Sequence, residues 1–359
     1  MLQLIYTLTG DDNYPPVLDS QLTDYLRKLT NALEDAVWQG QLRGRRGALG
    51  LFRAYEALSA DLRGSILLSP EGYEALNNLS HSASEENFDA MRRICEGALN
   101  EDTHSAGGSA EDAAEGFVID DALTVDIGSP FCKRQDLTSP VFFGAFEPFS
   151  GEETAILHRK LSAAFSEIST LSRTFARLIT SYTRKVFVRK NGTLLPASEQ
   201  VDTELGGIRL RNVHLDHYSH EQLMDDLIHE SVHNFLATFE FVNFPFLVHG
   251  GRYDPHTRPV SPWSMRPIRV LPFLHAAFVY FALLHFALRR LESGTLSGER
   301  RTEALTRRNR YASGFLMPGS LSSKVGGACD ADVRVLQVLD YMQENVMEMF
   351  SKVPELCEV

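Results

Sequence analysis

The residues of this 359-residue chain with the clearest chemical potential are His229, Glu230 and His233, which form an H-E-x-x-H motif. Residues four apart in a helix share one face, so both imidazoles can bind the same metal ion. Glu230 lies one step around the helix, where its carboxylate can reach a water molecule or a substrate group beside that metal. The motif therefore predicts a metal site and leaves open which metal it binds.

The sequence around the motif predicts a strand followed by a helix. Residues 206–215 alternate apolar and polar side chains, as in a half-buried strand. Ser219 is a suitable N-cap for a helix over 219–240, which carries an apolar stripe at helical spacing. The stripe consists of Leu223, Leu227, Ile228, Phe235 and Leu236.

The rest of the chain predicts an α+β fold that is predominantly helical, with a small sheet packed beside the H-E-x-x-H helix. A mainly helical N-terminal region, 1–150, would precede a metal-binding catalytic domain, 151–359. An exposed acidic loop is expected at 100–116. Helices are predicted at 19–80, 151–183, from about 272, at 299–313 and at 331–351, and strands or ordered segments at 117–131 and 185–189.

Composition limits the classes of partner and the compartment. The 35 basic and 47 acidic residues give a net charge of −12, which disfavours nucleic acid and anionic membranes as main partners. Four cysteines without metal-type spacing, and an N-terminus that does not resemble a signal peptide, predict a cytoplasmic protein. The apolar segment 271–288 contains His275 and His285, so it is expected to be a buried core helix rather than a membrane span.

Two histidines need a third protein ligand to form a stable site. The metzincin pattern fails, because Leu236 and Phe239 occupy the positions where it requires Gly and His. The gluzincin pattern, a downstream helical Glu followed four residues later by Asp, is also missing. The remaining candidates are His249, His256, His275 and His285 downstream, and His214, His217 and His220 upstream.

Three segments carry a more specific pattern: L-I-H-E-S-V-H-N-F-L at 227–236, S-P-W-S-M-R-P-I-R at 261–269 and L-H-A-A-F at 274–278. Together they resemble the H-E-x-x-H peptide-modification family of ribosomal-peptide biosynthetic clusters, regarded as 2-oxoglutarate-dependent peptide β-hydroxylases. The resemblance covers about residues 206–280. Pro272 and Ala276 stand where family members often have Gly, and the order of arginines and prolines differs slightly.

The resemblance implies an Fe(II)- and 2-oxoglutarate-dependent oxygenase that hydroxylates a side-chain β-carbon of a ribosomally made precursor peptide. His275 would join the two motif histidines as the third iron ligand, which leaves positions for 2-oxoglutarate and O₂. Arg266 or Arg269 would bind the distal carboxylate of 2-oxoglutarate. Trp263 would either line that pocket or anchor its own loop. Glu230 would ligate, orient or act as a base, and the N-terminal helices would be free to bind the precursor peptide.

Two other classes of protein fit the motif. In a zinc-dependent metallopeptidase, the two motif histidines and a third residue would bind Zn²⁺, and Glu230 would be the general base. The missing third-ligand patterns and the arginine-rich S-P-W element count against hydrolysis. In a non-catalytic helical binding protein the motif would be incidental, and the intact Glu230 counts against that class. The sequence leaves the oligomeric state open.

Overall fold

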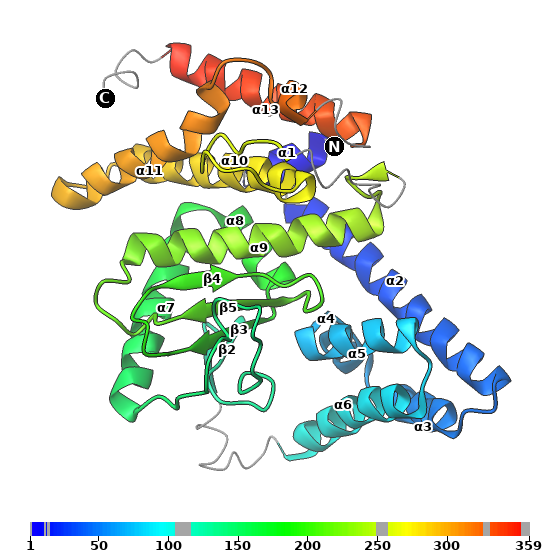
Figure 1. Ribbon diagram of the computed structural model, residues 1–359. Coiled ribbons are helices and arrows are strands. Elements are labelled where there is room, and N and C mark those ends of the chain that lie inside the picture. Colours follow the sequence, from blue (N-terminus) through cyan, green and yellow to red (C-terminus); the bar gives the residue numbers. More distant parts are fainter. Residues whose placement is uncertain are drawn as a thin grey trace. The chain divides into compact units, whose positions relative to one another are not determined.

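The computed structural model describes residues 2–10, 12, 15–104, 116–248, 258–325 and 331–352 (Figure 1). The chain forms two compact units. The first unit consists of Met1–Leu18, Ser166–Arg177 and Phe239–Val359, and the second of Asp19–Phe165 and Leu178–Thr238. Each unit combines segments that are distant in the sequence, whereas the sequence predicts one boundary near residue 150.

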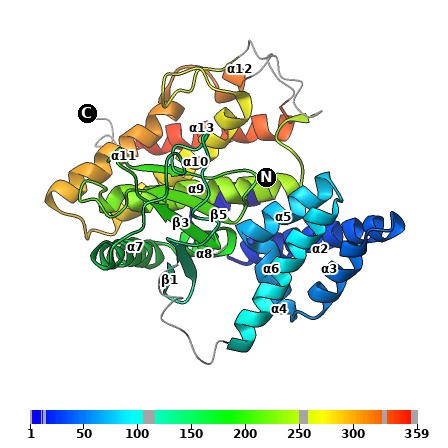
Figure 2. The ribbon, with the colours of Figure 1, turned by 60° about the horizontal axis from the view of Figure 1, so that its bottom comes forward.

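The N-terminal part of the second unit is a bundle of helices (Figure 2), which confirms the helical prediction for residues 19–80. Ser69 ends α4 and caps α5, because its hydroxyl accepts a hydrogen bond from the Gly72 amide at 3.1 Å. The last helix extends to His104, so residues 100–104 of the predicted loop are helical, which corrects that part of the prediction; residues 105–115 lie outside the described residues. The helix continues past residue 100 because, once a helix has nucleated, each added residue gains one hydrogen bond. The helices are α2 (Pro15–Leu42), α3 (Arg46–Glu56), α4 (Ala60–Leu68), α5 (Pro70–His81) and α6 (Glu85–His104).

A mixed five-stranded sheet completes the second unit, in the order β1-β2-β3-β5-β4. The three central strands are parallel, and both outer strands run antiparallel to their neighbours. The predicted strands at 185–189 and within 206–215 are confirmed. The strands are β1 (Gly116–Ile119), β2 (Leu123–Asp126), β3 (Lys185–Arg189), β4 (Ala197–Glu199) and β5 (Gly207–Arg211).

One face of the sheet carries buried arginines, which the irregular segment 127–149 covers. Arg189 donates to the carbonyl oxygens of Arg134 and Phe142 at 2.8 and 3.1 Å. Arg209 forms ion pairs with Glu204 and Glu199 at 2.5 and 3.0 Å. Successive side chains of a strand point to opposite faces, so Val188 and Leu210, each next to an arginine in its strand, face the other way. The arginines thus hold an irregular segment on the sheet by satisfying its backbone carbonyls.

The helix predicted over 151–183 is interrupted, so this prediction is wrong in one respect: α7 (Gly151–Leu171) ends and α8 (Arg173–Tyr182) begins at Ser172. The Ser172 hydroxyl accepts from the Phe175 amide at 3.2 Å and donates to the Gly10 carbonyl at 2.9 Å. Ser172 is therefore the N-cap of α8. The apolar periodicity continues across this cap, which is why the sequence pattern does not reveal it.

The first unit is built around α10 (Val270–Glu292), which confirms the helix predicted from about residue 272. Pro272 lies in its first turn, where a missing amide hydrogen costs little. In the described part of the chain α10 is the one helix long and apolar enough to cross a membrane, and 72% of its apolar window is buried, as in the core helix of a soluble protein. The other helices of this unit are α1 (Leu2–Leu8), α11 (Gly298–Leu316), α12 (Leu321–Val325) and α13 (Val333–Lys352).

Candidate metal centre

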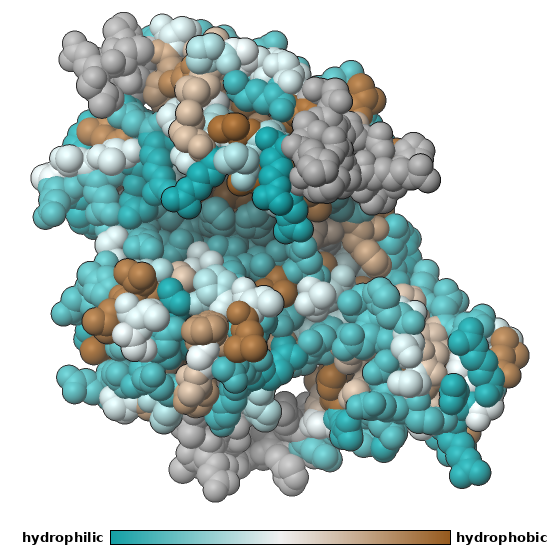
Figure 3. Space-filling model, viewed as in Figure 1, coloured by the Kyte–Doolittle hydropathy of each residue, from teal (hydrophilic) through white to brown (hydrophobic). Residues whose placement is uncertain are grey.

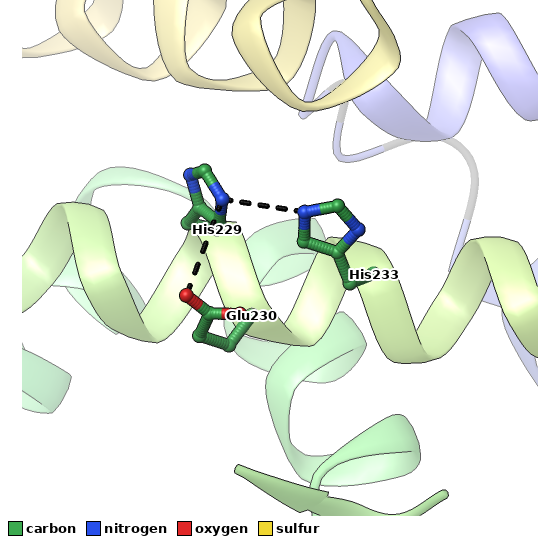
Figure 4. A group of neighbouring side chains, drawn as sticks. All are labelled: His229, Glu230 and His233. Carbon is green, nitrogen blue, oxygen red and sulfur yellow. Dashed lines mark hydrogen bonds and ion pairs between the residues drawn. The ribbon is translucent and has the colours of Figure 1, made fainter. Parts of the chain in front are cut away.

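The two motif histidines lie on α9 (His220–Val242), the helix that the sequence predicts at 219–240. Ser219 caps it, since its hydroxyl accepts from the Gln222 amide at 3.1 Å. The Nε2 atoms of His229 and His233 are 3.2 Å apart and face each other (Figure 4). Two nitrogen ligands at ~2.1 Å from one ion, with roughly 90–110° between them, lie about 3.0–3.4 Å apart. The two imidazoles therefore fit the spacing of ligands to one metal ion.

The Glu230 carboxylate lies beside this pair and is buried, with 4% of the residue exposed. Its Oε1 atom is 4.0 Å from His229 Nε2 (Figure 4) and accepts a hydrogen bond from the Ser198 hydroxyl at 2.7 Å. The backbone amide of Gln200 donates to the same carboxylate. Burial raises the pKa of Glu230 to about 7, although both hydrogen bonds oppose this shift. A carboxylate with this pKa can take up and release a proton near neutral pH.

A second carboxylate of α9, Asp226, lies one helical turn before Glu230. It accepts a hydrogen bond from the Tyr218 hydroxyl at 2.5 Å. Burial raises the pKa of Asp226 to about 6, and the nearby charge of Glu230 raises it further. A cation bound to the histidines would stabilise both carboxylates in their ionised form. Asp226 was not predicted as a site residue, although its position three residues before His229 is a usable signal.

The opposite side of the motif helix is fixed by polar residues that sequence reasoning did not assign. The hydroxyls of Ser231 and Thr183 are 2.7 Å apart and buried. Asn234 donates to the Gly207 carbonyl at 3.1 Å, at the beginning of β5. These contacts hold α9 against the sheet and so fix the direction in which both imidazoles point.

The connection from β5 to α9 is held by a single lysine. Lys160 Nζ donates to the carbonyl oxygens of Val213 at 3.0 Å, Leu215 at 2.5 Å and Tyr218 at 2.9 Å. Its three donors therefore satisfy three carbonyls of one short irregular segment. This segment sets where the motif helix starts relative to the sheet.

His275, the predicted third ligand, lies on α10 in the first unit, whereas the motif pair belongs to the second unit. It is 8% exposed, and its Nε2 atom is 2.7 Å from Glu240 Oε1. The Phe246 ring packs edge-on against the imidazole at a centroid distance of 5.5 Å. A carboxylate bonded to one ring nitrogen is the usual outer partner of a metal-binding histidine. The assignment of His275 as a ligand stays a prediction.

Trp263 anchors the loop that precedes α10. Its indole Nε1–H donates to the Tyr311 carbonyl at 2.9 Å, and its ring stacks on Tyr280 at 4.8 Å. Gly314 makes room for it, because a Cβ there would lie 2.2 Å from the indole. The loop itself closes through the Ser261 amide, which donates to the Arg266 carbonyl at 2.9 Å. The anchoring role expected as one alternative for Trp263 is thus observed, and a contribution to a cofactor pocket stays a prediction.

The predicted 2-oxoglutarate ligands, Arg266 and Arg269, are both exposed. Arg269 directly precedes α10 and is its N-cap residue. Neither guanidinium forms an ion pair with another residue in the parts of the chain that the structure describes. Each guanidinium can donate two parallel hydrogen bonds to a carboxylate.

The other candidate histidines have different surroundings. His214 lies 3.7 Å from Glu153, and His217 bonds to the Leu194 carbonyl at 2.7 Å. Burial lowers the pKa of His285 to about 4. His220 begins α9, and His249 and His256 lie outside the described residues.

No protein-family model and no curated protein matches the chain. The interpretation of the site therefore depends on its own residues. Those that the structure brings together within reach of one ion are His229, Glu230 and His233.

Proposed function

We propose that the protein is an Fe(II)- and 2-oxoglutarate-dependent oxygenase that hydroxylates a side-chain β-carbon of a ribosomally made precursor peptide. The observation that carries the proposal is the 3.2 Å separation of two imidazole nitrogens beside a buried carboxylate that stands 4.0 Å from the nearer one. The reaction balances as peptide C–H plus O₂ plus 2-oxoglutarate giving peptide C–OH, succinate and CO₂. Iron supplies the activation of O₂.

In this proposal His229, His233 and His275 bind the iron. The Glu240 carboxylate bonded to His275 supports the assignment, because such a partner fixes the orientation and tautomer of a ligating imidazole. Glu230 lies farther from His229 than the two imidazole nitrogens lie from each other. It therefore acts beside the metal, as an acceptor for a proton or a hydrogen bond, and not as a fourth ligand.

Arg266 and Arg269 are the proposed partners of the distal carboxylate of 2-oxoglutarate. The guanidinium group binds a carboxylate through two parallel hydrogen bonds and stays charged at any physiological pH. Their exposure and the absence of ion pairs within the described part of the chain support this role. The Trp263 anchor would keep their loop in one conformation, which lowers the entropic cost of binding the cofactor.

The edge of the sheet supports a peptide as substrate. Ser198, which contacts Glu230, belongs to the edge strand β4. On the other face of this edge, loops expose apolar side chains, and brown residues gather over the sheet in Figure 3. Leu137 and Leu195 are 72% and 65% exposed. The Arg211 side chain binds the carbonyls of Leu195 and Pro140 and so joins the two loops. Exposed apolar side chains beside a strand edge are features that an extended peptide can use.

A zinc-dependent metallopeptidase is the second candidate, and one observation favours it. Glu230 is held beside the histidines by Ser198 and the Gln200 amide, and a carboxylate that a bound cation keeps ionised suits a general base that takes a proton from a metal-bound water. A hydrolase of this kind has no requirement for 2-oxoglutarate, so the two arginines would have no role in the reaction. The two candidates therefore differ in their dependence on the cosubstrate.

The test is metal analysis of anaerobically purified protein, followed by a turnover assay with Fe(II), O₂ and 2-oxoglutarate. We expect succinate formation, lost in His229→Ala and in His275→Ala. His81→Ala is the matched control, because His81 is an exposed histidine on α5. Tightly held zinc without succinate, even with the cognate peptide present, would overturn the oxygenase and favour the hydrolase.

A further inference from the structure

We propose that Ser198 is a positioning residue that keeps the Glu230 carboxylate beside the metal and outside its set of ligands. The inference rests on the metal centre of the proposed function and adds to it the element that sets the role of Glu230. Sequence reasoning leaves three roles for this carboxylate: ligand, orienting group or base. The contact with Ser198 argues against the role of a ligand and is compatible with an orienting group or a base.

The geometry of the carboxylate carries the inference. The oxygen that faces His229 is Oε1, and the same atom accepts the Ser198 hydroxyl at 2.7 Å. The amide of Gln200, the residue that follows β4, gives the carboxylate a second donor. Oε1 is 4.0 Å from His229 Nε2, beyond the roughly 3.0–3.4 Å expected for adjacent ligands of one ion. Both donors thus hold the carboxylate at a distance that suits a hydrogen bond to a metal-bound group.

The strand that carries Ser198 is itself fixed on its other face. Ser198 pairs with Leu210 in the antiparallel ladder with β5. The next side chain, Glu199, points the opposite way and is held by Arg209 at 3.0 Å and by the Ser139 hydroxyl. β4 therefore cannot shift toward the helix without breaking the ion pair between Glu199 and the buried Arg209. This rigidity is what a positioning residue requires of its support.

Removal of the hydroxyl has a specific expected consequence. In Ser198→Ala the oxygen facing His229 loses its donor, and the carboxylate can turn toward the metal and coordinate it. The variant should therefore bind metal with an altered geometry while losing activity, by about 10–100-fold as is usual for such outer partners. Ser198→Thr keeps the hydroxyl and should keep the geometry of the wild-type protein.

The experiment uses Co(II) as the probe metal in the full chain and records its visible absorption bands without substrate. We expect changed bands in Ser198→Ala and bands like those of wild type in Ser198→Thr. The matched control is Ser322→Ala in the first unit, where a serine hydroxyl bonds to the Asp340 carboxylate at 2.6 Å. This control removes the same kind of hydrogen bond and should leave the bands unchanged.

A double-mutant comparison separates positioning from general damage to the fold. With Glu230→Gln in the background, the Ser198→Ala change should no longer alter the Co(II) bands, because no carboxylate remains to coordinate. A Ser198→Ala effect that persists in this background would overturn the inference, as would wild-type bands in the single variant. If Ser198→Ala does not fold, the two other variants decide. Altered Co(II) bands in Ser198→Thr would overturn the inference, and so would unaltered activity in Glu230→Gln.

Failure of the proposed function has a different signature. Co(II) bands that depend on Ser198, in a protein that makes no succinate, would reject the oxygenase and retain the positioning role. A wild-type protein that binds no Co(II) would reject both.

Discussion

At the scale of single residues, burial determines which side chains can titrate near neutral pH. Glu230 and Asp226 are both carboxylates on α9, and burial raises the pKa of Glu230 to about 7 and that of Asp226 to about 6. Asp136, at the surface of the same unit, has its pKa lowered to about 2 because it accepts hydrogen bonds from Thr138 and Arg209. The sequence contains the same functional group in each case. The difference in environment alone separates the pKa of Glu230 from that of Asp136.

The buried His285 predicts a pH dependence of stability. Burial on α10 lowers its pKa from 6.5 to about 4, so the folded state keeps the ring neutral while the unfolded state protonates it. The folded pKa is depressed, so stability is lost as pH falls from about 6.5 toward 4. The difference in proton binding integrates to a loss of about 2 kcal/mol between pH 7 and pH 5.

This dependence is measured by urea unfolding at the two pH values in wild type and His285→Leu. The variant should lose about 2 kcal/mol less than wild type on acidification. His81→Ala removes an exposed histidine on α5, and this variant should lose as much stability as wild type between pH 7 and pH 5. Equal losses in wild type and His285→Leu would contradict the prediction.

At the scale of elements, the motif helix is fixed by contacts on several sides. Ser198 on β4 contacts it at Glu230, Thr183 at Ser231, and β5 at Asn234. Each contact involves a short polar side chain and a neighbouring backbone or hydroxyl group, so each is directional. The helix could not rotate by one residue without losing all three contacts. The contacts therefore keep both imidazoles pointing toward the same position.

The N-terminal bundle gives a second prediction for elements. Gly40 on α2 lies against the α6 residue Phe88, and a Cβ at this position would be 2.3 Å from the Phe88 ring and 2.9 Å from Ala48 Cβ. Gly40→Ala should destabilise the protein by about 1–3 kcal/mol through overpacking. Gly97 on α6 has nothing within 4 Å of its added Cβ.

The matched substitution Gly97→Ala should therefore stabilise by about 0.5–1 kcal/mol, since alanine is the better helix former. The midpoints of urea unfolding at unchanged slope measure both effects. A Gly40→Ala protein as stable as wild type would show that α2 and α6 do not approach this closely.

At the scale of the whole molecule, metal binding to the proposed ligands is coupled to the stability of the chain. His229 and His233 belong to the second unit and His275 to the first. A metal that all three bind would stabilise the native chain by linkage, by about 2.7 kcal/mol at a free concentration of 100 times Kd. Metal binding and global stability are then coupled.

Thermal unfolding with and without Co(II) measures this coupling. We expect a rise in Tm for wild type and His81→Ala, reversed by a chelator, and a much smaller rise for His229→Ala and for His275→Ala. A full rise in His275→Ala would show that the third ligand comes from elsewhere, and the other residues of the site would then need reassignment.

The sequence by itself determined the predominantly helical α+β class, the strands at 185–189 and 207–211, and the helix that carries the motif, because these depend on local periodicity and capping. It also determined that two imidazoles share one helical face. Only the tertiary structure revealed the Ser172 cap, the arginine-lined face of the sheet, and the contact between Ser198 and Glu230. These features join residues that are distant in sequence or hidden within a continuous apolar pattern, so no local signal encodes them. Glu230 accepts a hydrogen bond from a strand residue 32 positions away in the sequence, so tertiary packing decides the environment of its carboxylate.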